Sequence, residues 1–132
     1  MSGPQRAAAR PLSPHLQIWR YHVTMLASIT HRITGAALYF GTFLIAAWLV
    51  ALAISPETYG AMDVVLASIP GKVILFLWAV AVMFHLFNGI RHLVWDGPGI
   101  GFSPKVASNV SAAIYILAIL SAAALMFAAS AF

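Results

Sequence analysis

Residues 33–56 read ITGAALYFGTFLIAAWLVALAISP and contain no charged residue and no histidine. A helix that crosses a bilayer needs about 20 mostly apolar residues, so this run is long enough to span. Two further runs without a formal charge, residues 73–90 and 106–132, meet the same requirement, and Leu93, Val94 and Trp95 extend the first of these. We therefore predict an all-α integral membrane protein with three transmembrane helices, near residues 27–54, 72–95 and 107–131.

The composition excludes several classes of protein. Hydrophobic residues make up 62% of the 132 residues and charged residues 8%, whereas a typical soluble domain has roughly 25% charged residues. A soluble helical bundle would need polar stripes at helical spacing, and the three runs have almost none. The absence of cysteine excludes disulfides, thiolate metal sites and iron–sulfur ligation. The formal charge of +4 comes from scattered cations, so nucleic-acid binding is not expected.

The charges predict how the chain is organised and oriented. Residues 1–26 are expected to form a cytoplasmic or interfacial segment, and residues 27–131 the three-helix transmembrane domain. Six of the seven Lys and Arg residues lie on one side of this plan: Arg6, Arg10, Arg20, Arg32, Arg91 and Lys105. The positive-inside rule therefore places the N-terminus and the second loop in the cytoplasm or the mitochondrial matrix. The first loop is expected to be an irregular turn that can include one short helix, and the second a tight Gly/Pro turn.

Two clusters of polar residues fall inside the predicted helices, where ionisable groups are costly and usually functional. The first cluster contains Ser28, His31, Arg32 and Gly35. The second contains His85, Asn88, Gly89 and His92, followed by Arg91 and Asp96. Within each cluster, offsets of about three, four and seven residues place the side chains on one helix face.

His85 is the most informative of these residues. It lies eleven residues before Asp96, or roughly 16 Å along a helix, which places it near the middle of the bilayer. An imidazole at that depth needs a partner, which can be a hydrogen bond across a helix interface, a metal ion or a haem iron. The other histidines are His15, His22, His31 and His92. All four are predicted near the inner surface, at a depth different from that of His85, so a bis-histidine haem would need a histidine from another chain.

The remaining polar residues of the inner side have open roles. His31 and Arg32 could bind haem propionates, because Arg matches a carboxylate with two parallel hydrogen bonds. Ser28 and Arg32 could instead bind a quinone carbonyl, and His92 and Asp96 could relay a proton. The structural alternatives are snorkelling or topology setting for Arg32, Arg91 and Asp96, and a hydrogen bond back to its own helix for Ser28.

Three motifs now suggest a family. They read RPLSPHL at residues 10–16, SITHRITG at 28–35 and HLFNGIRHLVWD at 85–96. Together they closely resemble the cytochrome b subunit of succinate dehydrogenase, respiratory complex II. The resemblance covers the chain from Arg10 to its end in length and helix number.

The resemblance implies a membrane anchor that is part of an enzyme without being catalytic alone. Such an anchor pairs with a second three-helix subunit, holds haem b between the two, and docks an iron–sulfur subunit and a flavoprotein subunit that pass electrons from succinate to ubiquinone. His85 matches the axial ligand of the haem iron, and the second ligand comes from the partner anchor. His31, Arg32 and His92 are expected on the haem propionate side, and Ser28, Arg32 and Asp96 at the quinone site.

Location and alternatives follow from the same resemblance. Only nine residues precede the first motif, which is short for a transit peptide. This favours a bacterial inner membrane, or an already processed chain, over the mitochondrial inner membrane, and membrane lipids are expected around the helices. One alternative is a fumarate reductase anchor, which uses similar parts in reverse. The other is a structural membrane subunit without a cofactor.

Overall fold

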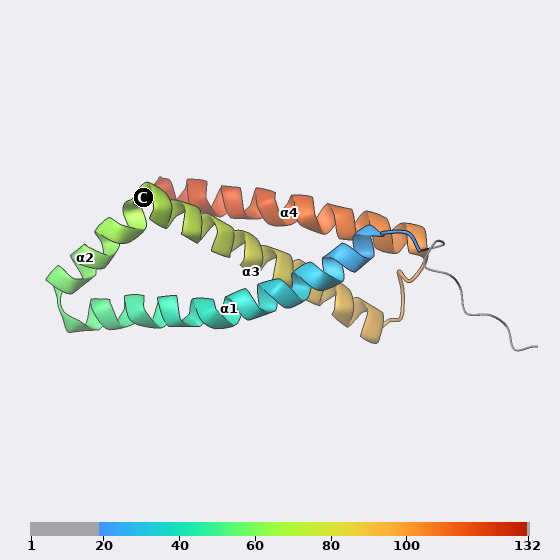
Figure 1. The fold of residues 1–132 in the computed structure, drawn as a ribbon, viewed down its shortest axis with the longest axis horizontal. Coiled ribbons are helices and arrows are strands. Elements are labelled where there is room, and N and C mark those ends of the chain that lie inside the picture. Colours follow the sequence, from blue (N-terminus) through green and yellow to red (C-terminus); the bar gives the residue numbers. More distant parts are fainter. Residues whose placement is uncertain (1–18, 132) are drawn as a thin grey trace, which may run out of the picture.

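The computed structural model describes residues 19–131, and this part of the chain forms four helices and no strand (Figure 1). Helix α1 covers Val23–Ile54, α2 Pro56–Ala67, α3 Ile69–Asp96 and α4 Pro104–Ser130. Helices α1, α3 and α4 are long and apolar enough to cross a membrane. The prediction of an all-α chain with three membrane-spanning helices is therefore confirmed.

Each long helix begins three or four residues before its predicted start. The prediction followed the charge-free runs, whereas a helix begins where its backbone is capped. His22 has an extended backbone (φ −122°, ψ 144°) and α1 starts directly after it, so residues 23–26 belong to α1 and not to the N-terminal segment. Pro104 opens α4. Proline lacks a backbone N–H, which costs nothing at this position because the first N–H groups of a helix make no hydrogen bond within it. The motif at residues 10–16 lies outside the described residues.

The first connection is more regular than an irregular turn. Ser55 caps α2, because its side-chain oxygen accepts a hydrogen bond from the backbone N–H of Thr58 at 3.2 Å, and Pro56 opens the helix. A side-chain hydrogen bond from Ser55 also lowers the pKa of Glu57 below its ordinary value. Ser68 then caps α3 by accepting from the backbone N–H of Gly71 at 3.2 Å. The short helix allowed for in this loop therefore fills 12 residues of it.

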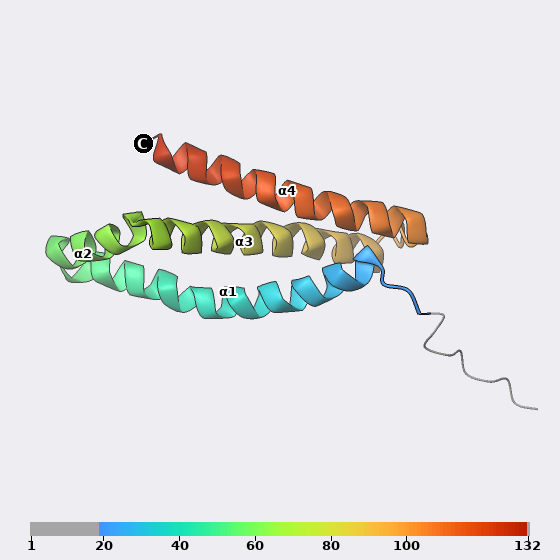
Figure 2. The ribbon, with the colours of Figure 1, turned by 45° about the horizontal axis from the view of Figure 1, so that its top comes forward.

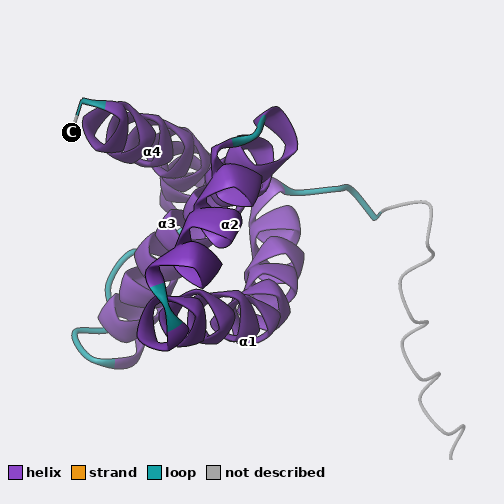
Figure 3. Ribbon diagram, turned by 90° about the vertical axis from the view of Figure 1, so that its left-hand side faces the viewer, coloured by secondary structure: helices purple, strands orange, loops and turns teal. Residues whose placement is uncertain are grey.

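Helix α3 lies between α1 and α4 (Figure 2), and α2 crosses the end of the bundle where it joins α1 to α3 (Figure 3). We call this the α2 end, and the opposite end, where residues 97–103 join α3 to α4, the linker end. The buried core of the three long helices comprises Ala27, Phe84, Ile114 and Ala118, with Met83, Phe87 and Tyr115 packed against it. Thr30 of α1 and Tyr115 of α4 are also joined by a 2.7 Å hydrogen bond.

The outward side chains of the long helices are mostly apolar. Phe40 is 68% exposed, Ile54 66% and Phe127 78%. Such a surface would be unfavourable in water, but it suits the hydrocarbon of a bilayer. The chain is therefore a multi-pass membrane protein.

Candidate functional site

Three histidines from two helices form a cluster in the half of the bundle near the linker end. His31 lies on α1, and His85 and His92 lie on α3. The rings of His31 and His85 are stacked, with centroids 4.0 Å apart and planes 10° from parallel. The ring of His92 lies 5.4 Å from that of His31. The two sequence clusters therefore meet at the interface between α1 and α3.

This stacking corrects the sequence argument about depth, which separated His31 from His85. Because α1 begins at Val23, His31 lies about 12 Å inside its helix, and His85 lies about 16 Å from the end of α3. The depths of His31 and His85 therefore differ by only about 4 Å, which two imidazole side chains can span. The exclusion of His31 by depth was wrong, because it relied on a predicted helix start four residues too late.

The Nδ1 atom of His85 is held by α1. It lies 3.2 Å from the backbone oxygen of His31 and 3.3 Å from the hydroxyl of Thr34. The Thr34 hydroxyl has one hydrogen, which it donates to the carbonyls of Thr30 or His31 at 2.9 and 3.0 Å, so toward His85 its oxygen acts as an acceptor. Both neighbours of Nδ1 are then acceptors. The proton of a neutral His85 ring therefore lies on Nδ1, and Nε2 keeps its lone pair for a ligand.

Gly35 allows His85 to come this close to α1. A Cβ atom at position 35 would lie 3.1 Å from Cε1 of His85, which is tighter than ordinary van der Waals contact. The missing side chain of Gly35 therefore makes room for the imidazole ring of His85.

The donor set favours one type of metal centre. Among residues 19–131, no group of three or more His, Cys, Asp or Glu side chains is arranged to hold a metal ion. A single imidazole with a free Nε2 suits an iron whose four other ligands come from a porphyrin. The hydrogen bond from Nδ1 to a backbone carbonyl is the usual second-shell support of a metal-binding histidine. The residues present therefore fit a haem.

His31 is not arranged as the second axial ligand. Two imidazoles that held one haem iron would each point a ring nitrogen at it from opposite sides, so their rings could not be stacked face to face. The rings of His31 and His85 are 4.0 Å apart and nearly parallel. In this geometry the chain offers one axial ligand from this pair. The Nδ1 atom of His31 is buried and has no hydrogen-bond partner among the described residues.

The other predicted site residues lie around this cluster. Ser28 is half-buried, Arg32 is exposed on α1, and Asp96 is exposed at the end of α3. Within residues 19–131, no hydrogen bond or ring contact joins these three side chains to the histidines. They are accessible from outside the bundle, as residues of a site shared with another subunit would be.

Sequence reasoning missed the polar contacts between helices. It did not single out Thr34, although the residue lies three positions after His31 on the same face. It offered Arg91 as a snorkelling or topology-setting residue, but Arg91 is 7% exposed and bonds Ser111 of α4. The spacing of Ala107, Ser111, Ala118 and Ala122 is the signal that marks the packing face of α4. Asn88 is fully buried, and both its amide atoms lack partners among the described residues.

Comparisons with known proteins find similarity to the membrane subunits of succinate dehydrogenase. A family model described as Succinate dehydrogenase/Fumarate reductase transmembrane subunit matches residues 6–129. The succinate dehydrogenase cytochrome b556 subunit of Paracoccus denitrificans is 43% identical over 105 residues, which cover 80% of this chain and 80% of the relative. That of Rickettsia bellii (strain RML369-C) is 38% identical over 84% of this chain and 86% of the relative. The mitochondrial succinate dehydrogenase cytochrome b560 subunit of Sus scrofa is 36% identical over 88% of this chain and 69% of the relative.

Proposed function

The chain belongs to the succinate dehydrogenase/fumarate reductase transmembrane subunit family, and we propose that it is the haem- and quinone-binding membrane anchor of a succinate:quinone oxidoreductase. In this role it is one subunit of an enzyme and is not catalytic alone. A second anchor subunit would complete the membrane bundle, and a flavoprotein and an iron–sulfur subunit would dock on it. Electrons taken from succinate would then reach ubiquinone at the membrane.

The geometry of His85 is the observation that carries the haem assignment. Its Nδ1–H is held by the His31 carbonyl and by Thr34, so Nε2 is the free nitrogen. We assign His85 as an axial ligand of haem b, and the second ligand to a histidine of the partner anchor. The haem, when bound, supplies a one-electron redox centre. Thr34 and the His31 carbonyl would fix the orientation of the ligand ring and raise its basicity.

Three further side chains are assigned to the propionate side of the haem. The ring of His31 stacks on that of His85 and lies 5.4 Å from that of His92, and Arg32 follows His31 on α1. A guanidinium binds a carboxylate with two charge-assisted hydrogen bonds, which are stronger than neutral ones. The unpartnered Nδ1 of His31 supports this assignment, because a buried ring nitrogen without a partner favours a ligand that supplies one.

Ser28, Arg32 and Asp96 are assigned to the quinone site. Reduction of a quinone takes up two electrons and two protons at its carbonyl oxygens. The Ser28 hydroxyl and the Arg32 guanidinium would donate hydrogen bonds to one such oxygen, which polarises the carbonyl and stabilises the developing negative charge. Asp96 would take part in delivering the protons. The accessibility of Arg32 and Asp96 supports a site completed by other subunits.

The location proposed is the inner membrane of a bacterial cell, with the N-terminus in the cytoplasm. The excess of Lys and Arg at the linker end supports this orientation through the positive-inside rule. It places Ser28, Arg32 and Asp96 on the cytoplasmic side, where soluble subunits could reach them. The family description also covers fumarate reductase anchors, which run the same electron path in reverse, and the names of the relatives favour the succinate dehydrogenase direction.

The test is a reduced-minus-oxidised visible spectrum of the purified complex, with the wild type beside His85→Ala and His22→Ala. We expect a low-spin b-type signal in the wild type, which weakens or shifts in His85→Ala because one axial ligand is lost. His22 is exposed and precedes α1, so His22→Ala should leave the signal unchanged. A wild-type complex without haem, or a normal signal in His85→Ala, would overturn the assignment and favour a structural subunit without a cofactor.

A further inference from the structure

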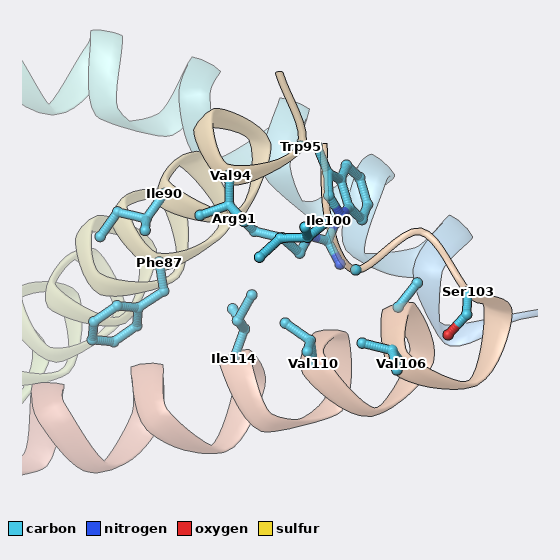
Figure 4. Close-up of a pocket in the computed structure, with 12 residues that line it drawn as sticks. Phe87, Ile90, Arg91, Val94, Trp95, Ile100, Ser103, Val106, Val110 and Ile114 are labelled. Carbon is cyan, nitrogen blue, oxygen red and sulfur yellow. The ribbon is translucent and has the colours of Figure 1, made fainter. Parts of the chain in front are cut away.

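A groove runs between α3 and α4 at the linker end (Figure 4). Its volume is about 610 Å³, within the range of ligand pockets. The apolar part of its wall comprises Phe87, Ile90, Val94, Val106, Val110 and Ile114. Arg91 lies six residues after His85, which is about 240° around the helix axis, so it leaves α3 on another side than His85. The groove adjoins the histidine cluster at Trp95, whose ring lies 5.3 Å from that of His92.

Arg91 supplies the charge in this groove. Figure 4 shows its side chain extending from α3 into the space beside α4, close to Trp95. Its Nη1 donates a hydrogen bond to Ser111, and the guanidinium carbon lies 4.5 Å from the centre of the Trp95 ring. Among the described residues its buried Nε has no hydrogen-bond partner. The side chain is 7% exposed, so a cation is held among apolar side chains with its buried Nε–H unused.

The chain itself supplies no counter-ion at this place. Its three acids are Glu57 and Asp63, which lie on α2 at the other end of the bundle, and Asp96. Asp96 is exposed and lies five residues after Arg91, about 140° around the helix. A buried cation without a paired anion is costly. The site therefore favours a ligand that brings a negative charge into an apolar groove.

We propose that the groove binds a membrane phospholipid, with its phosphodiester on Arg91 and the upper part of an acyl chain along the apolar wall. Arg binds phosphate oxygens with parallel hydrogen bonds, and basic pockets between transmembrane helices near the membrane surface are typical lipid head-group sites. Trp95 stacks with Phe102, with centroids 5.5 Å apart, and aromatic rings of this kind lie at the level of the head groups. A phospholipid satisfies both the charge of Arg91 and the apolar wall, which a small soluble anion would not.

The experiment measures phosphatidylglycerol binding to the purified, delipidated complex by native mass spectrometry. Arg91→Gln removes the charge, and we expect at least tenfold weaker binding at one site. Lys105→Gln removes an exposed cation of the first turn of α4 and should leave binding unchanged. Val110→Trp fills the groove while keeping the charge of Arg91, and should also weaken binding. Its matched control is Leu117→Trp, seven residues further on the same face of α4 and outside the groove.

Three outcomes would overturn the proposal. Unchanged lipid binding in Val110→Trp, which keeps Arg91 and its bond to Ser111, would exclude the groove even if Arg91→Gln were to assemble poorly. Displacement of the lipid by inorganic phosphate alone would indicate a site for soluble anions. Loss of another subunit from both variants, with lipid binding intact, would show that a protein segment covers the groove. The haem spectrum tests the proposed function separately, because none of the four substituted residues is assigned to the haem or the quinone.

Discussion

Two glycines of α1 meet two aromatic rings of α3, and the two contacts differ in their chemistry. Gly35 faces His85 near the linker end, and Gly41 faces Trp78 further toward the α2 end. In both places a side chain on the glycine would press on the ring. Near the linker end, Nδ1 of His85 is bound by Thr34 and the His31 carbonyl. The Nε1 of Trp78, in contrast, is buried and has no partner within residues 19–131.

The difference separates packing from positioning. Lipid tails are as apolar as the helices, so helices associate in a membrane through close contact and interhelical hydrogen bonds. Gly41 and Trp78 provide close contact and nothing more. Gly35, His85 and Thr34 provide close contact, and the hydrogen bonds of His85 also fix the proton of its ring on Nδ1. We therefore expect substitutions at the α2 end to change stability, and substitutions at the linker end to change haem or quinone chemistry.

The largest expected effect is on activity at the linker end. Arg32→Ala should lower quinone reductase activity by about tenfold to a hundredfold, and haem content should fall less. The expected effect on activity corresponds to the loss of one charge-assisted hydrogen bond, which contributes about 1.5–3 kcal/mol. Lys72→Ala, which removes a cation near the α2 end, should leave turnover unchanged. A variant of Arg32 that lost its haem but kept normal quinone turnover would contradict the assignment.

The next effect is on stability at Gly41. Gly41→Ala should destabilise the solubilised complex by about 1–3 kcal/mol, because the new Cβ overlaps the Trp78 indole and forces the two helices apart. A lower thermal unfolding midpoint with an unchanged haem spectrum is expected. Gly60→Ala on α2, where a Cβ meets open space, is the control and should not lower the midpoint. A shifted haem spectrum in Gly41→Ala would break the separation between packing and positioning.

A smaller effect is expected at Thr34. Thr34→Val keeps the shape but removes an acceptor of the His85 Nδ1–H, so haem should transfer to apomyoglobin about tenfold faster. The ligand becomes a weaker donor to ferric iron, so the midpoint potential should rise, by about 59 mV if ferric affinity alone falls tenfold. Thr34→Ser retains the hydroxyl and should restore both values. Equal behaviour of the valine and serine variants would show that the hydroxyl does not position His85.

The smallest effect is expected at the hydrogen bond between Thr30 and Tyr115, which joins α1 to α4. An interhelical hydrogen bond in a membrane contributes about 0.6 kcal/mol on average. Thr30→Val and Tyr115→Phe should each lower the thermal midpoint slightly, and the double variant should be no worse than the more harmful single change. Fully additive losses would mean that the two side chains do not act as a pair.

Much of the fold followed from the distribution of charge. The three uncharged runs located the three long helices, because a bilayer excludes charged side chains whatever the tertiary arrangement. The predicted helix starts were three or four residues too late, because backbone geometry and capping set the true starts. His22 is extended and precedes α1, Ser68 caps α3, and Pro104 opens α4. The 12-residue helix α2 was allowed for but not delimited, because its composition resembles that of a loop.

The candidate site divides in the same way. Regular helical spacing predicts that His31 shares a helix face with Gly35, and His85 with His92. The histidines were candidates for a functional site because ionisable side chains are costly inside a membrane. The contact between His31 and His85 could not be predicted, because the relative height of two helices depends on where each begins and how they cross. The same holds for Thr34 and for Arg91, whose roles depend on side chains more than fifteen residues away in the sequence.

The sequence by itself therefore determined that this chain crosses a membrane three times, and it singled out the polar residues that we propose bind haem and quinone. These properties depend on hydropathy and residue type, which act locally along the chain. The tertiary structure decided that Nδ1 of His85 is the nitrogen bound to α1, that His31 stacks on His85, and that Arg91 is buried beside an apolar groove. These properties depend on the packing of α3 against α1 and α4, which only the assembled helices define.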